Sequence, residues 1–104
     1  MTANLILGID PGLKNTGWGV INSFKNKESY LSHGVIKTNS SDNLGKRLLS
    51  IYKGVVQLTE EFKPSFISVE KIFSNINPES TLKLGKVRGI IFLVAAMYKI
   101  QITE

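Results

Sequence analysis

Residues 5–21 read Leu5-Ile6-Leu7-Gly8-Ile9-Asp10-Pro11-Gly12-Leu13-Lys14-Asn15-Thr16-Gly17-Trp18-Gly19-Val20-Ile21. The apolar run at residues 5–9 predicts a buried strand, and it ends in a carboxylate, Asp10. Pro11-Gly12 predicts a turn, Asn15-Thr16-Gly17 a second turn, and residues 18–21 a returning strand. The stretch therefore predicts a hairpin with an acid at the mouth of its first strand. Asp10 is interpreted either as a metal ligand or general base, or as an Asp that hydrogen-bonds its own turn.

Composition restricts the class of protein. The chain has 104 residues, enough for one small domain, and its 42% hydrophobic and 20% charged content is ordinary for a globular protein. It contains no cysteine, which excludes disulfides and thiolate metal sites and fits a reducing cytoplasm. We expect neither a signal peptide nor a membrane span. The net charge of +5 favours a polyanion such as nucleic acid as partner, although such a charge also serves solubility alone.

Two further elements are expected before residue 65. Loose alternation of apolar residues predicts a third strand at residues 28–37, which completes an antiparallel meander. The apolar spacing becomes helical over residues 44–62, and Pro64 ends that helix. Ser41 or Asp42 is expected to cap its N-terminus.

A short apolar strand, residues 66–69, follows the helix and ends in Glu70. A strand reached through a helix is usually parallel to its neighbour in the sheet. If that neighbour is the first strand, Asp10 and Glu70 lie side by side at the carboxyl edge of the sheet. Two such carboxylates can hold a hard divalent cation such as Mg²⁺ together with substrate phosphate. The alternative is two unrelated acids at the starts of loops.

Asn77-Pro78-Glu79 predicts the start of a second helix, which ends near Tyr98. Its small and apolar residues on one side are Leu82, Gly85, Gly89, Leu93 and Ala96. Each helical glycine costs about 1 kcal/mol relative to alanine, a loss that close packing of another backbone commonly offsets. Ile100 and Ile102 suggest the start of another strand.

Two features between the acids and the second helix suit nucleic acid. Phe73, in the loop after Glu70, is interpreted either as a stacking platform for an unpaired base, worth about 1–3 kcal/mol, or as a core residue. The nearby cations are Lys71, Lys83, Lys86 and Arg88. They suit phosphate contacts, and the alternative is an ordinary solvated helix face.

Four motifs together resemble the RuvC family of bacterial crossover junction endodeoxyribonucleases, also called Holliday junction resolvases. They are Gly-Ile-Asp-Pro-Gly at 8–12, Thr-Gly-Trp-Gly-Val at 16–20, Val-Glu-Lys-Ile-Phe at 69–73 and Leu-Lys-Leu-Gly-Lys-Val-Arg-Gly at 82–89. The resemblance covers nearly the whole chain. It implies an α/β fold, a ribonuclease-H-like mixed sheet of three antiparallel strands and then a parallel strand, with flanking helices. The C-terminal strand and helix of the family are expected to be missing.

The resemblance implies an endonuclease that uses Mg²⁺, with Mn²⁺ as a substitute, to nick a four-way DNA junction symmetrically. Asp10 and Glu70 match the family's first two catalytic acids, and Phe73 matches the aromatic residue that stacks on a junction base. The second helix matches the dimer interface, which would account for Gly85 and Gly89. The implied partners are junction DNA, a second copy of the chain and the RuvA–RuvB branch-migration complex.

One departure from the family concerns the acids. Family members carry two more catalytic acids on a C-terminal helix, whereas the only acid here after Glu79 is Glu104, which matches neither. We therefore expect residues 1–104 to form a single incomplete domain that cleaves junctions poorly or not at all. Two other functions stay open: an inactive junction-binding or dimerising module, and a nucleotide-binding domain of the actin and sugar-kinase type, which has a similar strand–acid–turn hairpin.

Overall fold

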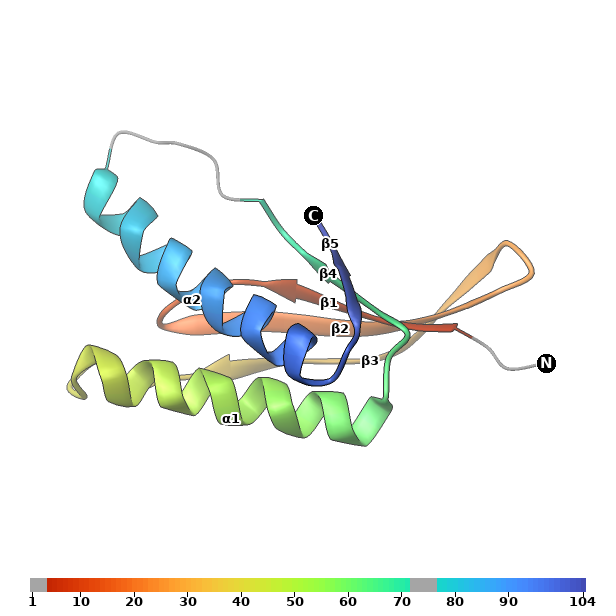
Figure 1. Cartoon of the computed structure of the whole chain (residues 1–104), viewed down its shortest axis with the longest axis horizontal. Helices are drawn as coiled ribbons and strands as arrows, with labels where there is room; N and C mark the ends of the chain where they lie inside the picture. The colour runs from red at the N-terminus through yellow and green to blue at the C-terminus, as the bar shows by residue number, and fades with distance from the viewer. Residues whose placement is uncertain (1–3, 72–76) are drawn as a thin grey trace.

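A computed structural model of the chain describes residues 4–71 and 77–104. The elements in chain order are β1 (Asn4–Asp10), β2 (Asn15–Phe24), β3 (Lys27–Lys37), α1 (Leu44–Phe62), β4 (Phe66–Val69), α2 (Pro78–Met97) and β5 (Gln101–Thr103) (Figure 1). The strands form one sheet in the order β3-β2-β1-β4-β5. β1, β2 and β3 pair antiparallel, whereas β4 is parallel to β1 and β5 is parallel to β4. This arrangement confirms the predicted mixed sheet with its parallel fourth strand.

β5 corrects the expectation that the C-terminal strand is missing. Lys99, with a left-handed φ of 55°, turns the chain after α2, and the backbone N–H of Ile100 donates to the Ala95 carbonyl at 2.8 Å. Ile102 then pairs with Ile67 of β4 and packs against the core. Three residues suffice for this strand because β4 is already in place to pair with it.

Both helices cover the same face of the sheet (Figure 1). In β1, Leu7 and Ile9 are buried against the helices, so the alternation of a strand turns Gly8 and Asp10 to the opposite face. The buried apolar residues form one cluster: Leu7, Ile9, Val20, Ile51, Val55, Leu58, Ile67, Val69, Val87, Ile91, Val94 and Ala95. Since Val69 is likewise buried, Glu70 follows Asp10 to the face that α1 and α2 leave uncovered.

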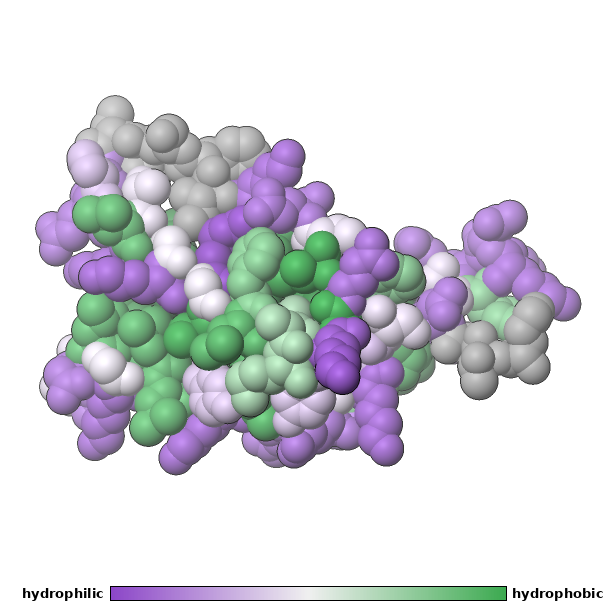
Figure 2. All heavy atoms as spheres, viewed as in Figure 1, coloured by the Kyte–Doolittle hydropathy of each residue, from purple (hydrophilic) through white to green (hydrophobic). Residues whose placement is uncertain are grey.

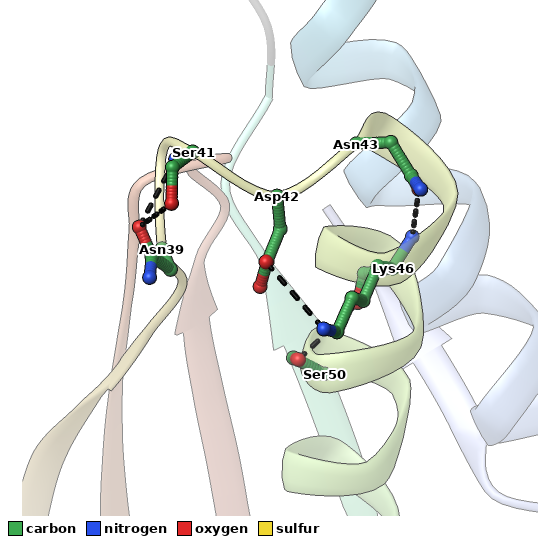
Figure 3. A network of polar contacts seen from close by, with 6 residues as sticks. All are labelled: Asn39, Ser41, Asp42, Asn43, Lys46 and Ser50. Carbon is green, nitrogen blue, oxygen red and sulfur yellow. Dashed lines mark hydrogen bonds and ion pairs between the residues drawn. The ribbon is translucent and has the colours of Figure 1, made fainter.

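Asn43 caps α1, so the prediction of Ser41 or Asp42 is wrong by one or two positions. The Asn43 side-chain oxygen accepts a hydrogen bond from the backbone N–H of Lys46 at 2.8 Å. Ser41 instead bonds the side chain of Asn39, and Asp42 pairs with the Lys46 ammonium at 3.6 Å (Figure 3). Three consecutive residues of capping type precede the helix, and spacing alone did not select among them.

α2 begins as predicted, with Asn77 as its cap, but it carries apolar residues on two sides. One side supplies core residues, whereas the exposed large apolar residues are Leu82, Phe92, Leu93 and Met97. Figure 2 shows hydrophobic surface gathered over α2, while the β2–β3 hairpin is mostly hydrophilic. A Cβ placed on Gly85 or Gly89 would find no atom within 4 Å, so these glycines lie open. Within the described residues, neither helix is long and apolar enough to cross a membrane.

Candidate functional site

The carboxyl ends of β1 and β4 bring two acids together. The parallel register pairs Ile9 with Val69, and the backbone N–H of Glu70 donates to the Ile9 carbonyl at 3.1 Å. Asp10 is thus the last residue of β1 and Glu70 directly follows β4, the neighbouring strand, which meets the condition under which we expected the two acids side by side. Both side chains are exposed at this edge. Their roles as ligands stay a prediction.

The two carboxylates interact directly. A hydrogen bond between the side chains, followed by charge repulsion from Asp10, raises the pKa of Glu70 above its usual 4.5. Such a shift means that one proton is held more tightly because it relieves the repulsion between two close carboxylates. A divalent cation relieves the same repulsion, and carboxylate oxygens are the donors that Mg²⁺ prefers. The donor set thus fits a hard cation.

An open cleft of about 330 Å³ surrounds the acids. Its lining residues are Gly8, Ile9, Asp10, Gly17, Trp18, Gly19, Ser68 and Glu70. Gly8 pairs with Gly19 across β1 and β2, and a Cβ on Gly8, Gly17 or Gly19 would lie no closer than 3.8 Å to its nearest neighbour. Internal packing therefore does not require these glycines, and they leave bare backbone that a ligand can approach closely. Our sequence reasoning missed this floor; the alternating glycines at 17 and 19 were the available signal.

A buried threonine fixes the turn after Asp10. The Thr16 hydroxyl donates to the Gly12 carbonyl at 2.6 Å and accepts from the Gly12 N–H at 3.3 Å. Gly17 pairs with Asp10, so Asn15, Thr16 and Gly17 belong to β2, and the predicted second turn is wrong. The turn is confined to the four residues between the strands.

The side chain of Arg88, which is 13% exposed, reaches the main chain of Glu70. Its guanidinium donates to the backbone carbonyl of Glu70 and pairs with the Glu104 carboxylate. It also lies 5.4 Å from the centroid of the Phe92 ring. Arg88 thereby ties α2 to the ends of β4 and β5. Its predicted contact with DNA stays a prediction, and the structure adds this anchoring contact to it.

Three of the remaining predicted residues, all lysines, lie in the described part of the chain. Lys71 and Lys86 are exposed, and Lys83 pairs with Glu79 at 3.5 Å. Phe73 lies outside the described residues. Within residues 4–71 and 77–104, no group of three or more His, Cys, Asp or Glu side chains could hold a metal ion.

Comparison with known proteins covers almost the whole chain. Residues 6–104 match the family model of crossover junction endodeoxyribonuclease RuvC. RuvC of Paramagnetospirillum magneticum is 42% identical over 99 residues, which are 95% of this chain and 60% of that protein. RuvC of Legionella pneumophila strain Lens is 40% identical over 96% of this chain and 58% of its own length. The chain therefore spans about 60% of the length of these curated relatives.

A solved structure agrees in fold. RuvC of T. thermophilus in complex with Holliday junction substrate superposes with a TM-score of 0.86 at 25% identity, over 95% of this chain and 62% of that chain. The strand order and the parallel pairing of β1 with β4 in this chain therefore agree with the fold of a solved member of the family that its sequence matches. Because both comparisons cover nearly every residue, the chain belongs to the RuvC family of crossover junction endodeoxyribonucleases.

Proposed function

We propose that the whole protein resolves four-way DNA junctions by Mg²⁺-dependent phosphodiester hydrolysis, with Mn²⁺ as a substitute. The observation that carries this proposal is the pair Asp10 and Glu70 on a cleft floored by glycine backbone. A phosphodiester is bulky and anionic, so it needs both a bare floor and neutralised acids to approach. We also propose that residues 1–104 form one ribonuclease-H-like domain that acts in the cytoplasm.

Asp10 and Glu70 would hold the cation, each through a carboxylate oxygen. When bound, Mg²⁺ supplies charge stabilisation for the attacking and leaving oxygens of the phosphate. The chain's own contribution is to keep both carboxylates at one edge and to orient the DNA. With only two acids together in the described residues, we keep the expectation that this chain alone cleaves poorly or not at all.

Lys71, Lys83 and Lys86 are proposed to contact phosphates on the α2 side of the acids, and Phe73 is proposed to stack on a junction base. Lys83 would exchange its ion pair with Glu79, at 3.5 Å, for a phosphate contact. Such exposed pairs contribute about 0–1 kcal/mol, so the exchange is easily driven.

The outer side of α2 is proposed as the homodimer interface. Leu82 and Leu93 are 67% and 51% exposed, and Gly85 and Gly89 would let a second backbone approach. A two-fold enzyme also matches a two-fold substrate. Leu93→Glu is expected to convert a dimer into a monomer in sedimentation experiments; a parent chain that is already monomeric would refute the interface. The RuvA–RuvB complex is proposed as the functional partner.

The test of the site is cation binding. We would titrate Mn²⁺ into the chain, into Asp10→Asn and into Glu28→Gln, and detect free Mn²⁺ by electron paramagnetic resonance. Glu28 is an exposed acid at the far end of β3 and serves as the matched control. Asp10→Asn is expected to weaken binding at least about tenfold, because one of two anionic ligands is lost. Equal binding by the three proteins would refute the site.

Cleavage of a synthetic four-way junction distinguishes the two functions that the acids leave open. The sparse ligand set favours, as a second candidate, a junction-binding module without activity. Binding without nicks would support that candidate for this chain. Paired nicks that vanish in Asp10→Asn would show that two carboxylates suffice and that our expectation of poor cleavage is wrong.

A further inference from the structure

Three cations surround Thr38 on the β3 side of the cleft. They are Lys14, Lys37 and Arg47, and we call this group the basic corner. Thr38 ties them together. Its backbone N–H donates to the Lys14 carbonyl at 3.0 Å, and its hydroxyl donates to the Leu13 carbonyl at 2.5 Å. The Arg47 Nε donates to the same hydroxyl at 3.0 Å. The corner is therefore a fixed arrangement that links the β1–β2 turn, the end of β3 and the start of α1.

Within residues 4–71 and 77–104, the cations of the basic corner have no ion-pair partner. Lys14 and Lys37 are exposed, and in the part of the chain that the structure describes neither lysine makes an ion pair. The single acid of the loop between β3 and α1 is Asp42, and it pairs with Lys46 instead, at 3.6 Å (Figure 3). The first turn of α1 contains no acid. This corner therefore presents uncompensated positive charge to solvent.

The basic corner lies at the same edge of the sheet as the acids. The antiparallel register pairs Lys37 with Asn15, and two residues later Gly17 of β2 pairs with Asp10. In the order β3-β2-β1-β4, three strand spacings separate the strand of Lys37 from that of Glu70, which is about 14 Å. Lys71, which is exposed, directly follows Glu70 in the chain, so a cation also stands next to the acid pair at the end of β4.

We propose that the basic corner is a second contact for the DNA backbone, on the β3 side of the acid pair. This inference rests on the proposed function, because it takes the acids as the place where a phosphodiester is bound. One strand of DNA carries a charge for about every 3.4 Å of rise, so a backbone that crosses the sheet edge places several phosphates over a span of about 14 Å. Lys and Arg contacts of this kind fix the position of DNA without reading its sequence.

The two strands that carry the basic corner also supply its control. Lys25 and Lys27 lie at the opposite end of β2 and β3, where Phe24 pairs with Lys27. That end is about 30 Å away at the usual rise of a strand. Lys14→Gln with Lys37→Gln removes the same charge as Lys25→Gln with Lys27→Gln. The glutamine at position 14 keeps the backbone carbonyl that accepts from Thr38, and all four lysines are exposed, so we expect both double variants to fold.

The experiment measures the affinity of the full chain for a four-way junction over a series of salt concentrations, with circular dichroism to verify folding. Loss of two phosphate contacts is expected to reduce the slope of log K against log salt by about 1.8 and to weaken binding at 0.1 M salt by up to about 60-fold. The control pair should leave the slope unchanged. Lys14→Arg with Lys37→Arg should bind like the parent.

Two results would overturn the inference in distinguishable ways. If both double variants reduce the slope equally, the effect is general charge and the basic corner is not a contact, while the proposed function stands. If the parent chain shows no salt-dependent junction binding, the proposed function and this inference both fail.

Discussion

Gly12→Ala tests how the turn after Asp10 is fixed. None of the described glycines has a positive φ, so backbone conformation does not demand glycine here. Space does, because a Cβ on Gly12 would lie 2.1 Å from the carbonyl oxygen of Asn15. Restoring an ordinary contact of 3.4 Å requires a displacement of about 1.3 Å. The position of a Cβ is fixed by the backbone and the Asn15 carbonyl belongs to the backbone, so no side-chain rotation relieves the clash.

The displacement would be costly for two reasons. Overpacking usually lowers the free energy of unfolding by about 1–3 kcal/mol. Moving Gly12 also breaks its bonds to the Thr16 hydroxyl, which is fully buried, and an unsatisfied buried group costs about 1–3 kcal/mol more. We expect a total loss of about 2–6 kcal/mol. At a urea m-value of about 1.5 kcal/mol/M, the unfolding midpoint falls by about 1.3–4 M.

Urea unfolding followed by fluorescence of the single tryptophan, Trp18, measures this loss. Gly8→Ala is the matched control, since its Cβ would meet the Gly19 carbonyl oxygen at an ordinary 3.8 Å. An alanine there gains up to about 1 kcal/mol because it restricts the unfolded chain. If Gly12→Ala and Gly8→Ala unfold at the same urea concentration, steric fixation of the turn is wrong.

Three further predictions concern stability. Because the pKa of Glu70 is raised, the contribution of this residue to stability is present below pH 4.5 and is lost as the pH rises through the raised value. Glu70→Gln should therefore unfold at a higher urea concentration than the parent at pH 7 and at the same urea concentration below pH 4.5. Gly34→Ala places a Cβ 2.6 Å from the Trp18 ring and should cost about 1–3 kcal/mol, and a double-mutant cycle with Trp18→Leu should show this cost largely recovered. Glu104→Gln should lower stability by about 1 kcal/mol, an effect that high salt reduces, because it removes the ion pair to Arg88; equal losses at low and high salt would contradict this.

The position of the acid pair was predictable from sequence because it depends on rules that need no side-chain detail. Asp10 and Glu70 each follow a buried apolar run, and a strand–helix–strand connection fixes the relative direction of those runs. The cap of α1 was less predictable, since Ser41, Asp42 and Asn43 are all capping types and only the exact start of the helix selects one.

The contacts of Arg88 could not be predicted from the spacing of residues in the sequence. Its position on α2 suggested a solvated or phosphate-binding cation, and Glu104 had no expected partner. Arg88 and Glu104 come together because β5 pairs with β4, and the periodicity of a helix does not encode this tertiary pairing. The glycine floor was also hidden, since the use of a glycine depends on what lies opposite its missing side chain.

When both acids are ionised, the main chain around them holds them together against their mutual repulsion. Asp10 precedes a turn fixed by the bonds between Gly12 and Thr16, and the backbone carbonyl of Glu70 accepts a hydrogen bond from Arg88. Each anchor acts on backbone, so it holds the carboxylates close even though the pair repels when ionised. Neutralising an acid should therefore stabilise the fold and weaken cation binding, whereas loosening an anchor should weaken both. Opposite changes in fold stability and cation binding are expected of a site that keeps a destabilising charge repulsion because the repulsion serves ligand binding.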